Sequence, residues 1–326
     1  MSLKEIEHPE WIDHYCIDRE ALSDCIERWK YTYQKEYGDI YICKPFPGIH
    51  LWANDVFMHA IPTEQLEEYH FIKLNYCIDG RCEVQLVDDR YVYLEKGILS
   101  IDSNSPKENF LFPGARYKGV ELVLDLKKLK HQKIQALYDL GFDVAKLGEQ
   151  LKKFHGSYVA TVSRQWKEIV ETTWEKLVNH DGKIEDFRFY TLQLLYLLGK
   201  GSTMSIEKRF YLTKGQRTIA ARVEKKICED LKKHYTVEEL AREYGISPSS
   251  LKKYFEQVYG IPISEYLRQK RMEFAKELLA CSDLSVADVA AEAGYSNQGK
   301  FSSAFKRYTQ KTPLEYRRLQ TINCEG

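Results

Sequence analysis

The sequence predicts an α+β protein of several domains, with an antiparallel β-barrel in front, a helical bridge, and an all-α domain at the end. Three observations predict it. Apolar and polar residues alternate between about residues 40 and 124, helical periodicity begins near Leu126, and one helical pattern occurs twice in the last third. The 326 residues suffice for two or three domains of roughly 100–200 residues each. We expect domains over residues 1–125, 126–213 and 214–320.

The first domain is expected to open with a helix over residues 18–37, because Leu22, Ile26 and Trp29 fall on one helical stripe. Short strands follow, separated by turn residues such as Pro47-Gly48. Their spacing is typical of a sandwich or small barrel.

Two turns are expected within these strands. The runs 84–87 and 91–94 flank Asp88-Asp89-Arg90, which predicts a hairpin with a tight turn. A second turn at Asp79-Gly80 would place Cys77 and Cys82 across another hairpin. Such a pair could act as a redox switch or could be two buried, reduced cysteines.

Residues 126–213 show the helical period in three segments, which contain Leu129, Ile169 and Leu192 respectively. A helical bridge with surplus apolar surface would suit a homodimer contact. The alternative is that these helices only cover the barrel.

The zero net charge of the chain hides a split between its parts. Residues 214–326 contain 20 Lys and Arg against 15 Asp and Glu, so this part carries +5 and the rest carries −5. A basic part joined to an acidic one fits a nucleic-acid binder with a sensor. The start of the chain lacks the apolar block of a secretory signal, and the longest apolar stretch, residues 191–198, is too short to span a bilayer. We therefore expect a cytoplasmic protein without a membrane partner.

The repeated pattern is the most informative feature of the sequence. The segments 236–245 and 285–294 each begin with a hydroxyl residue, carry an acid three positions later, and end with glycine. This order predicts a helix with a capping box and a left-handed glycine at its C-terminal end. A second helix follows each segment after a short turn, so we expect helix-turn-helix units over 236–258 and 285–308.

A linker helix over residues 263–280 should join the two units. It contains no internal Gly or Pro, and Leu267, Phe274, Leu278 and Leu279 are expected to form its buried stripe. Such a rod could place two recognition helices in successive major grooves, about 34 Å apart.

From Ala220 to Arg318 the sequence resembles the arabinose-regulator (AraC/XylS) family of bacterial transcription factors. The residues that carry the resemblance are Tyr254-Phe255, Gly260, the stretch 266–271, Gly294-Tyr295-Ser296-Asn297, and the closing segment 312–317. Residues 69–99 are similar to the cupin-type barrel that these regulators often use as an effector domain.

The resemblance implies an effector-responsive regulator of transcription that is not an enzyme. Its expected partners are double-stranded DNA, RNA polymerase, a small-molecule effector and a second copy of the chain. No metal or other cofactor is expected. The sequence departs from the family at Gln310, where a glycine is usual, and at Ser303, where many members have a basic residue.

The expected DNA contacts lie on the outward faces of the two recognition helices. On the first helix the family's base-reading positions correspond to Ser249, Lys252 and Lys253, and Gln257 also faces outward. On the second helix the candidates are Gln298, Gly299, Ser302 and Ser303, with Lys300, Lys306 and Arg307 as phosphate contacts. Candidate effector-pocket residues are Tyr41, Trp52, Phe57, Phe71 and Tyr76, which could equally be core.

Two other classes of protein remain as alternatives. A cupin-type metal enzyme would need clustered histidines, whereas His50, His59 and His70 are isolated. A DNA alkyl-transfer repair protein with a related DNA-binding module would need a reactive cysteine in an electropositive pocket. None of the eight cysteines forms a C-x-x-C pair.

Overall fold

The computed structural model describes residues 16–61, 71–85, 90–103, 110–131, 134–154, 156–200, 204–206 and 211–324. The chain divides into two compact units, Met1–Lys214 and Gly215–Gly326. Each unit has its own apolar cores.

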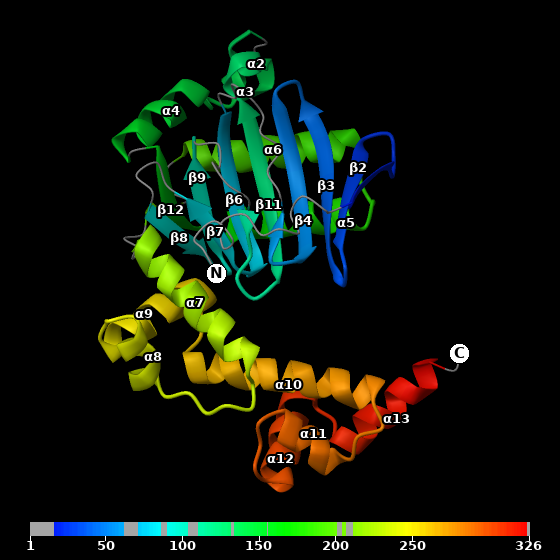
Figure 1. Cartoon of the computed structure of the whole chain (residues 1–326). Helices are drawn as coiled ribbons and strands as arrows, with labels where there is room; N and C mark the ends of the chain where they lie inside the picture. Colours follow the sequence, from blue (N-terminus) through cyan, green and yellow to red (C-terminus); the bar gives the residue numbers. More distant parts are fainter. Residues whose placement is uncertain are drawn as a thin grey trace. The chain divides into compact units, whose positions relative to one another are not determined.

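Nine strands of the first unit form one antiparallel sheet (Figure 1). Their spatial order is β1 (Cys16–Ala21), β2 (Ile26–Tyr33), β3 (Glu36–Phe46), β4 (Ile49–Phe57), β11 (Tyr117–Asp125), β6 (Phe71–Gly80), β9 (Ile98–Asp102), β12 (Ser157–Val162) and β13 (Met204–Ile206). The predicted antiparallel strands are confirmed. Within the described residues the edge strands β1 and β13 do not pair with each other, so this sheet is open rather than a closed barrel.

The helix expected over residues 18–37 is wrong, because this segment forms β1, β2 and the start of β3. β2 pairs with both β1 and β3. Trp29, Tyr31 and Tyr33 alternate with polar residues at the strand period of two, and aromatic residues favour a half-buried sheet surface. The helical stripe was therefore a coincidence of spacing that sheet pairing overrides.

The hairpin predicted around residues 84–94 is confirmed. β7 (Cys82–Gln85) pairs with β8 (Arg90–Leu94), and Asp88 and Asp89 lie outside the described residues. These two strands and β14 (Leu212–Thr213) form a three-stranded sheet, while β5 (Ala60–Ile61) pairs with β10 (Phe110–Leu111).

The second expected hairpin, at Asp79-Gly80, is wrong. β6 pairs with β9 and β11, whereas β7 pairs with β8, so Gly80 is a corner between two sheets. Gly80 has φ +77°, and a Cβ there would lie 2.0 Å from the Arg116 carbonyl oxygen. Cys77 and Cys82 therefore do not face each other across a hairpin.

Helices α5 (Arg164–Val178) and α6 (Ile184–Gly199) lie behind one face of the large sheet, and three shorter helices lie at one end of it (Figure 1). The shorter helices are α2 (Leu126–His131), α3 (Gln135–Asp139) and α4 (Val144–Lys153). Trp166 of α5 donates from Nε1 to the Leu194 carbonyl of α6 at 3.2 Å, and its ring centre lies 5.4 Å from that of Tyr76 in the sheet. Because β12 lies between these helices in sequence and pairs with β9, the helices and the sheet form one unit.

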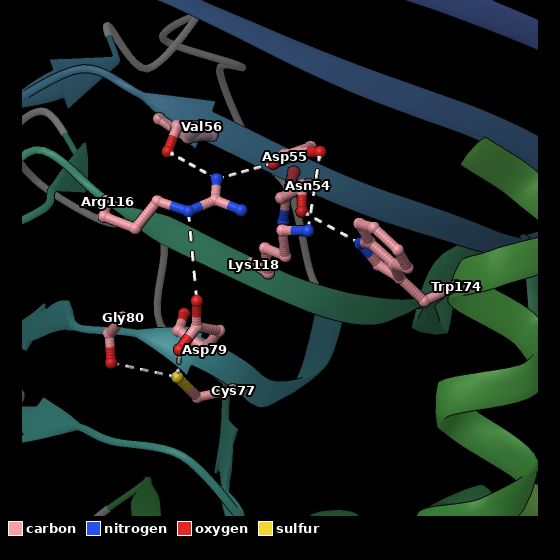
Figure 2. Close-up of polar contacts among 9 residues, drawn as sticks. All are labelled: Asn54, Asp55, Val56, Cys77, Asp79, Gly80, Arg116, Lys118 and Trp174. Carbon is pink, nitrogen blue, oxygen red and sulfur yellow. Dashed lines mark hydrogen bonds and ion pairs between the residues drawn. The ribbon is translucent and has the colours of Figure 1, made fainter. Parts of the chain in front are cut away.

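Polar contacts join α5 to β4 and β4 to β6 (Figure 2). Trp174 of α5 donates from Nε1 to the Asn54 carbonyl of β4 at 3.0 Å. Arg116 Nη1 lies 2.5 Å from Asp55 Oδ1 of β4, and Arg116 Nε lies 3.9 Å from Asp79 Oδ2 of β6, so this side chain joins the two strands. The other face of the sheet carries a second core, to which β7 and β8 contribute Val84 and Val92.

The second unit is helical in all its regular elements. These are α7 (Lys214–Glu229), α8 (Val237–Glu243), α9 (Pro248–Tyr259), α10 (Ile263–Cys281), α11 (Val286–Glu292), α12 (Gln298–Thr309) and α13 (Pro313–Cys324). One core lies around Leu240 and Phe255 and a second around Phe301 and Phe305. The predicted all-α domain with two helix pairs is confirmed.

Candidate nucleic-acid interface

The first helix-turn-helix unit begins at Thr236 with a reciprocal cap. The Thr236 amide donates to Glu239 Oε2 at 3.0 Å, and the Glu239 amide donates to Thr236 Oγ1 at 3.2 Å. The backbone bond from Thr236, with help from its hydroxyl, lowers the pKa of the Glu239 carboxyl, because the charged form accepts both. Gly245 follows α8 with φ +63°. The capping box and the left-handed glycine are both as predicted.

The recognition helix of this unit, α9, is capped by Ser247. The Ser247 hydroxyl accepts from the Ser250 amide at 3.1 Å, and Pro248 occupies the first helical position, where no N–H is needed. Leu251, Phe255 and Val258 face the core. The opposite face exposes Ser249, Lys252 and Lys253, while Gln257 is half-buried.

The second helix-turn-helix unit repeats this construction, but the capping box predicted there is only half formed, because the Ser285 amide does not donate to the Asp288 side chain. The Ser285 hydroxyl accepts from the Asp288 amide at 3.1 Å, which caps α11, and Gly294 ends the turn with φ +75°. Asn297 caps α12 by accepting from the Lys300 amide at 2.8 Å. The two recognition helices therefore start from equivalent caps.

The outward face of α12 is polar and basic. Phe301 and Phe305 are fully buried, whereas Tyr308 is 41% exposed. Gln298, Gly299, Lys300, Ser303, Lys306 and Arg307 are exposed, and Ser302 is half-buried. α12 contains no acidic residue, so its surface is suited to a negatively charged partner.

The linker helix α10 runs from the first helix pair to the second (Figure 1) and contributes to both cores. Its first half contributes Tyr266 and Leu267 to the first core, and its second half contributes Ala275 and Leu279 to the second. Of the predicted stripe, Leu267 and Leu279 are buried, while Phe274 and Leu278 are only half-buried. The buried face is rotated from the prediction because the two cores lie on different sides of the helix.

Arg271 ties the linker helix to the loop before α8. It donates from Nε to the Leu231 carbonyl at 2.8 Å and from Nη2 to the Lys233 carbonyl at 3.1 Å. Its guanidinium also lies 6.0 Å from the centre of the Tyr295 ring in the second helix-turn-helix unit. Sequence reasoning missed this role, although the signal was present as a basic residue in an otherwise apolar helix face.

The loop before α8 also contacts the second helix-turn-helix unit directly. Lys232 Nζ lies 2.8 Å from Glu292 Oε1 of α11. A Cβ at Gly294 would lie 2.5 Å from the Leu231 carbonyl oxygen, so only glycine allows this approach. The two helix-turn-helix units are therefore held together by contacts besides the linker helix.

The five candidate effector-pocket residues do not come together. Tyr41 and Tyr76 lie in the core under the helices, whereas Trp52 packs against the core on the opposite face of the sheet. Phe57 is 39% exposed and stacks near Tyr37, with ring centres 4.9 Å apart, and Phe71 is half-buried at the start of β6.

Several cysteines have the properties of structural thiols. Burial raises the pKa of Cys43, Cys77 and Cys228 to about 12, which is the opposite of the activation that an alkyl acceptor needs. Among the described residues, no three His, Cys, Asp or Glu side chains are grouped to hold a metal ion, and His70 lies outside them. None of the described helices has the length and apolar character required to cross a membrane.

Comparison with known proteins places the similarity in the helical unit. A family model described as a helix-turn-helix domain matches residues 240–319. The transcriptional regulator ExsA of Pseudomonas aeruginosa is 34% identical over 91 residues, which are 27% of this chain and 33% of ExsA. The virulence regulon transcriptional activator VirF of Yersinia enterocolitica is 31% identical over 96 residues, which are 29% of this chain and 35% of VirF.

A solved structure of the DNA-binding domain of AdpA, in complex with a target DNA, is 27% identical with a TM-score of 0.31. That similarity covers 32% of this chain and 94% of the solved chain. The chain thus spans about a third of the length of the two curated relatives.

Proposed function

We propose that this chain, whose C-terminal domain is a helix-turn-helix domain of the AraC type, is a sequence-specific regulator of transcription. The observation that carries the proposal is a pair of capped recognition helices, α9 and α12, attached to one unbroken helix. The 19 residues of α10 span about 28 Å, close to the 34 Å or so that separates successive major grooves.

The outward residues divide into two roles in this proposal. Ser249, Lys252 and Lys253 read base edges in one groove, where lysine donates to guanine O6 and N7. Gln298, Gly299, Ser302 and Ser303 face the second groove, and Lys300, Lys306 and Arg307 hold the phosphate backbone. Gln257, being half-buried, contributes at the edge of the first contact.

The compact unit that contains the large sheet, Met1–Lys214, acts as the sensor in this proposal. Its sheet is covered by helices on one face and short strands on the other, an arrangement that can enclose a small effector. We further propose that this unit forms the homodimer and that the bound regulator acts on RNA polymerase. Phe189 of α6, which is 59% exposed, supports a protein contact on the helical face. The protein acts without enzymatic activity and in the cytoplasm.

The test uses residues 215–326 alone, since both helical cores lie within them. The fragment should fold and select a common motif from random genomic fragments, with affinity that falls steeply with salt. Removal of Met1–Lys214 should lower the affinity for DNA only by the avidity that a dimer provides. A fragment that is helical by circular dichroism but shows no sequence preference would refute the proposed function.

A further inference from the structure

Four polar side chains form a continuous row across the large sheet. In the strand register Trp52 of β4 pairs with Glu121 of β11, Glu121 with Asn75 of β6, and Asn75 with Ser100 of β9. Directly paired residues of antiparallel strands point to the same face. Because β4, β11, β6 and β9 are neighbours (Figure 1), the row crosses four strands and spans about 14 Å.

The row lies in the interior, on the face that also carries the second core. Asn75 and Ser100 are fully buried, and Glu121 is only 5% exposed. Each of the four residues has a buried polar atom for which the described residues supply no hydrogen-bond partner, namely Trp52 Nε1, Glu121 Oε2, Asn75 Nδ2 and Ser100 Oγ. Folded proteins rarely leave such atoms unpaired, because each loses its bonds to water. Four of them side by side form a site where a small molecule could supply the missing hydrogen bonds.

Neighbouring bonds fix which atoms the row offers. The Tyr117 hydroxyl donates to Asn75 Oδ1, so the Asn75 amide nitrogen is left as a donor. Asn54 donates from Nδ2 to Glu121 Oε1 at 3.1 Å, so Glu121 Oε2 is left as an acceptor. Trp52 supplies a second donor, and the Ser100 hydroxyl can act in either sense. A ligand must therefore both accept and donate hydrogen bonds.

The charges around the row exclude an anion. Lys73 Nζ lies 3.9 Å from Glu121 Oε2, and Lys73 pairs in register with Asp102. All three side chains are buried, so two carboxylates face one ammonium group. An added carboxylate or phosphate would meet this excess of negative charge in a region where water screens it weakly.

We propose that the row formed by Trp52, Glu121, Asn75 and Ser100 binds a small, uncharged or cationic molecule that carries hydroxyl or amino groups. The ligand donates to Glu121 Oε2 and accepts from the Trp52 and Asn75 nitrogens. This inference rests on the proposed function only in that the bound molecule would be the effector. Trp52 is the one candidate effector residue from the sequence that takes part.

The experiment measures binding to the full chain with a size-matched panel of compounds. One arm contains small polyols and amino alcohols, and the other contains dicarboxylates and phosphate monoesters. At least one compound of the first arm should bind saturably, raise the melting temperature and change tryptophan fluorescence. The fluorescence change should disappear in Trp52→Phe. The anionic arm should not bind.

Three variants separate binding from folding. Glu121→Gln should weaken binding about tenfold or more, because it removes a charged acceptor. Glu168→Gln, which alters only an exposed pair with Arg164, is the matched control and should bind like the parent. Ser100→Ala should leave the melting temperature of the free protein unchanged or higher while binding falls several-fold. This variant decides the matter if Glu121→Gln does not fold.

A panel without any saturable binder would overturn the proposal. So would binding that is equal in the parent, Glu121→Gln and Ser100→Ala, or a high-resolution crystal structure in which ordered waters alone satisfy the four atoms of the row in the presence of the panel. DNA binding by residues 215–326 is measured independently of all these outcomes, so a failure here is distinct from a failure of the proposed function.

Discussion

Two glycines end equivalent helices in the two helix-turn-helix units, but for different reasons. Both have positive φ, and no atom lies within 4 Å of a Cβ built at Gly245, whereas a Cβ at Gly294 meets the Leu231 carbonyl at 2.5 Å. Backbone conformation alone decides the first position. Backbone conformation and lack of space both decide the second.

This contrast gives a prediction with its own control. Gly245→Ala should cost about 1 kcal/mol, which is the usual penalty for a left-handed non-glycine residue. Gly294→Ala should cost about 1–3 kcal/mol more, because the added methyl overpacks the contact between the units. Urea unfolding of residues 215–326 measures both values. Equal losses would show that the contact with Leu231 is not tight in solution.

Gln310 stands where the AraC/XylS family usually has a glycine. It takes the left-handed conformation itself, with φ +61°, so the turn before Pro313 is formed by a residue with a Cβ. Gln310→Gly should therefore stabilise the domain by about 0.5–1 kcal/mol in urea unfolding. Gln310→Ala retains the Cβ and should not stabilise. A gain from the alanine variant would assign the effect to the lost side chain rather than to the backbone.

At the scale of elements, the two recognition helices should differ in what they contribute. Lys253→Ala on α9 should cost about 1–3 kcal/mol on the preferred site and relax base preference in one half-site. Lys306→Ala on α12 should weaken binding to all sequences alike and reduce the salt slope by about one unit. Binding isotherms on preferred and scrambled DNA at several salt concentrations distinguish the two. A similar loss of specificity in both variants would contradict the division of roles.

The elements also show where periodicity is a reliable guide. In residues 215–326 the caps, the left-handed glycines and the apolar spacing all predict the same helices, and the predicted helix pairs are confirmed. At residues 18–37 the apolar spacing favours a helix, but aromatic residues alternate at the strand period. Pairing between β1, β2 and β3 satisfies the backbone there. At residues 18–37 the apolar spacing of a helix was therefore outweighed by strand pairing.

At the scale of the whole DNA-binding unit, contacts between its halves should fix the spacing of half-sites. Insertion of about five base pairs turns the second groove to the far face of the duplex. Specific affinity should then fall strongly, and ten added base pairs should not restore it, because α10 cannot lengthen. Gel-shift titrations of residues 215–326 measure this. Undiminished binding to the five-base-pair variant would mean that only one helix pair works.

Arg271 provides a further test of the same rigidity. Arg271→Ala removes the bonds to the Leu231 and Lys233 carbonyls. It should lower affinity for the native spacing and also reduce the penalty for the insertion. Arg268→Ala, which breaks a pair with Glu265 on the same helix, is the control and should keep the parental spacing preference. Identical spacing profiles for Arg271→Ala and the parent would limit the role of Arg271 to stability.

The sequence by itself determined the features that depend on residues a few positions apart. These are the caps at Thr236 and Ser285, the turns at Gly245 and Gly294, and the outward faces of α9 and α12, since each is set within one or two helical turns. The tertiary structure alone decided the strand order, the place of residues 16–33 at a sheet edge, and the joining of both helix pairs by Arg271. It also separated Tyr41 and Tyr76 from Trp52 and placed Trp52 beside Glu121, because pairing between distant strands decides which side chains share a face.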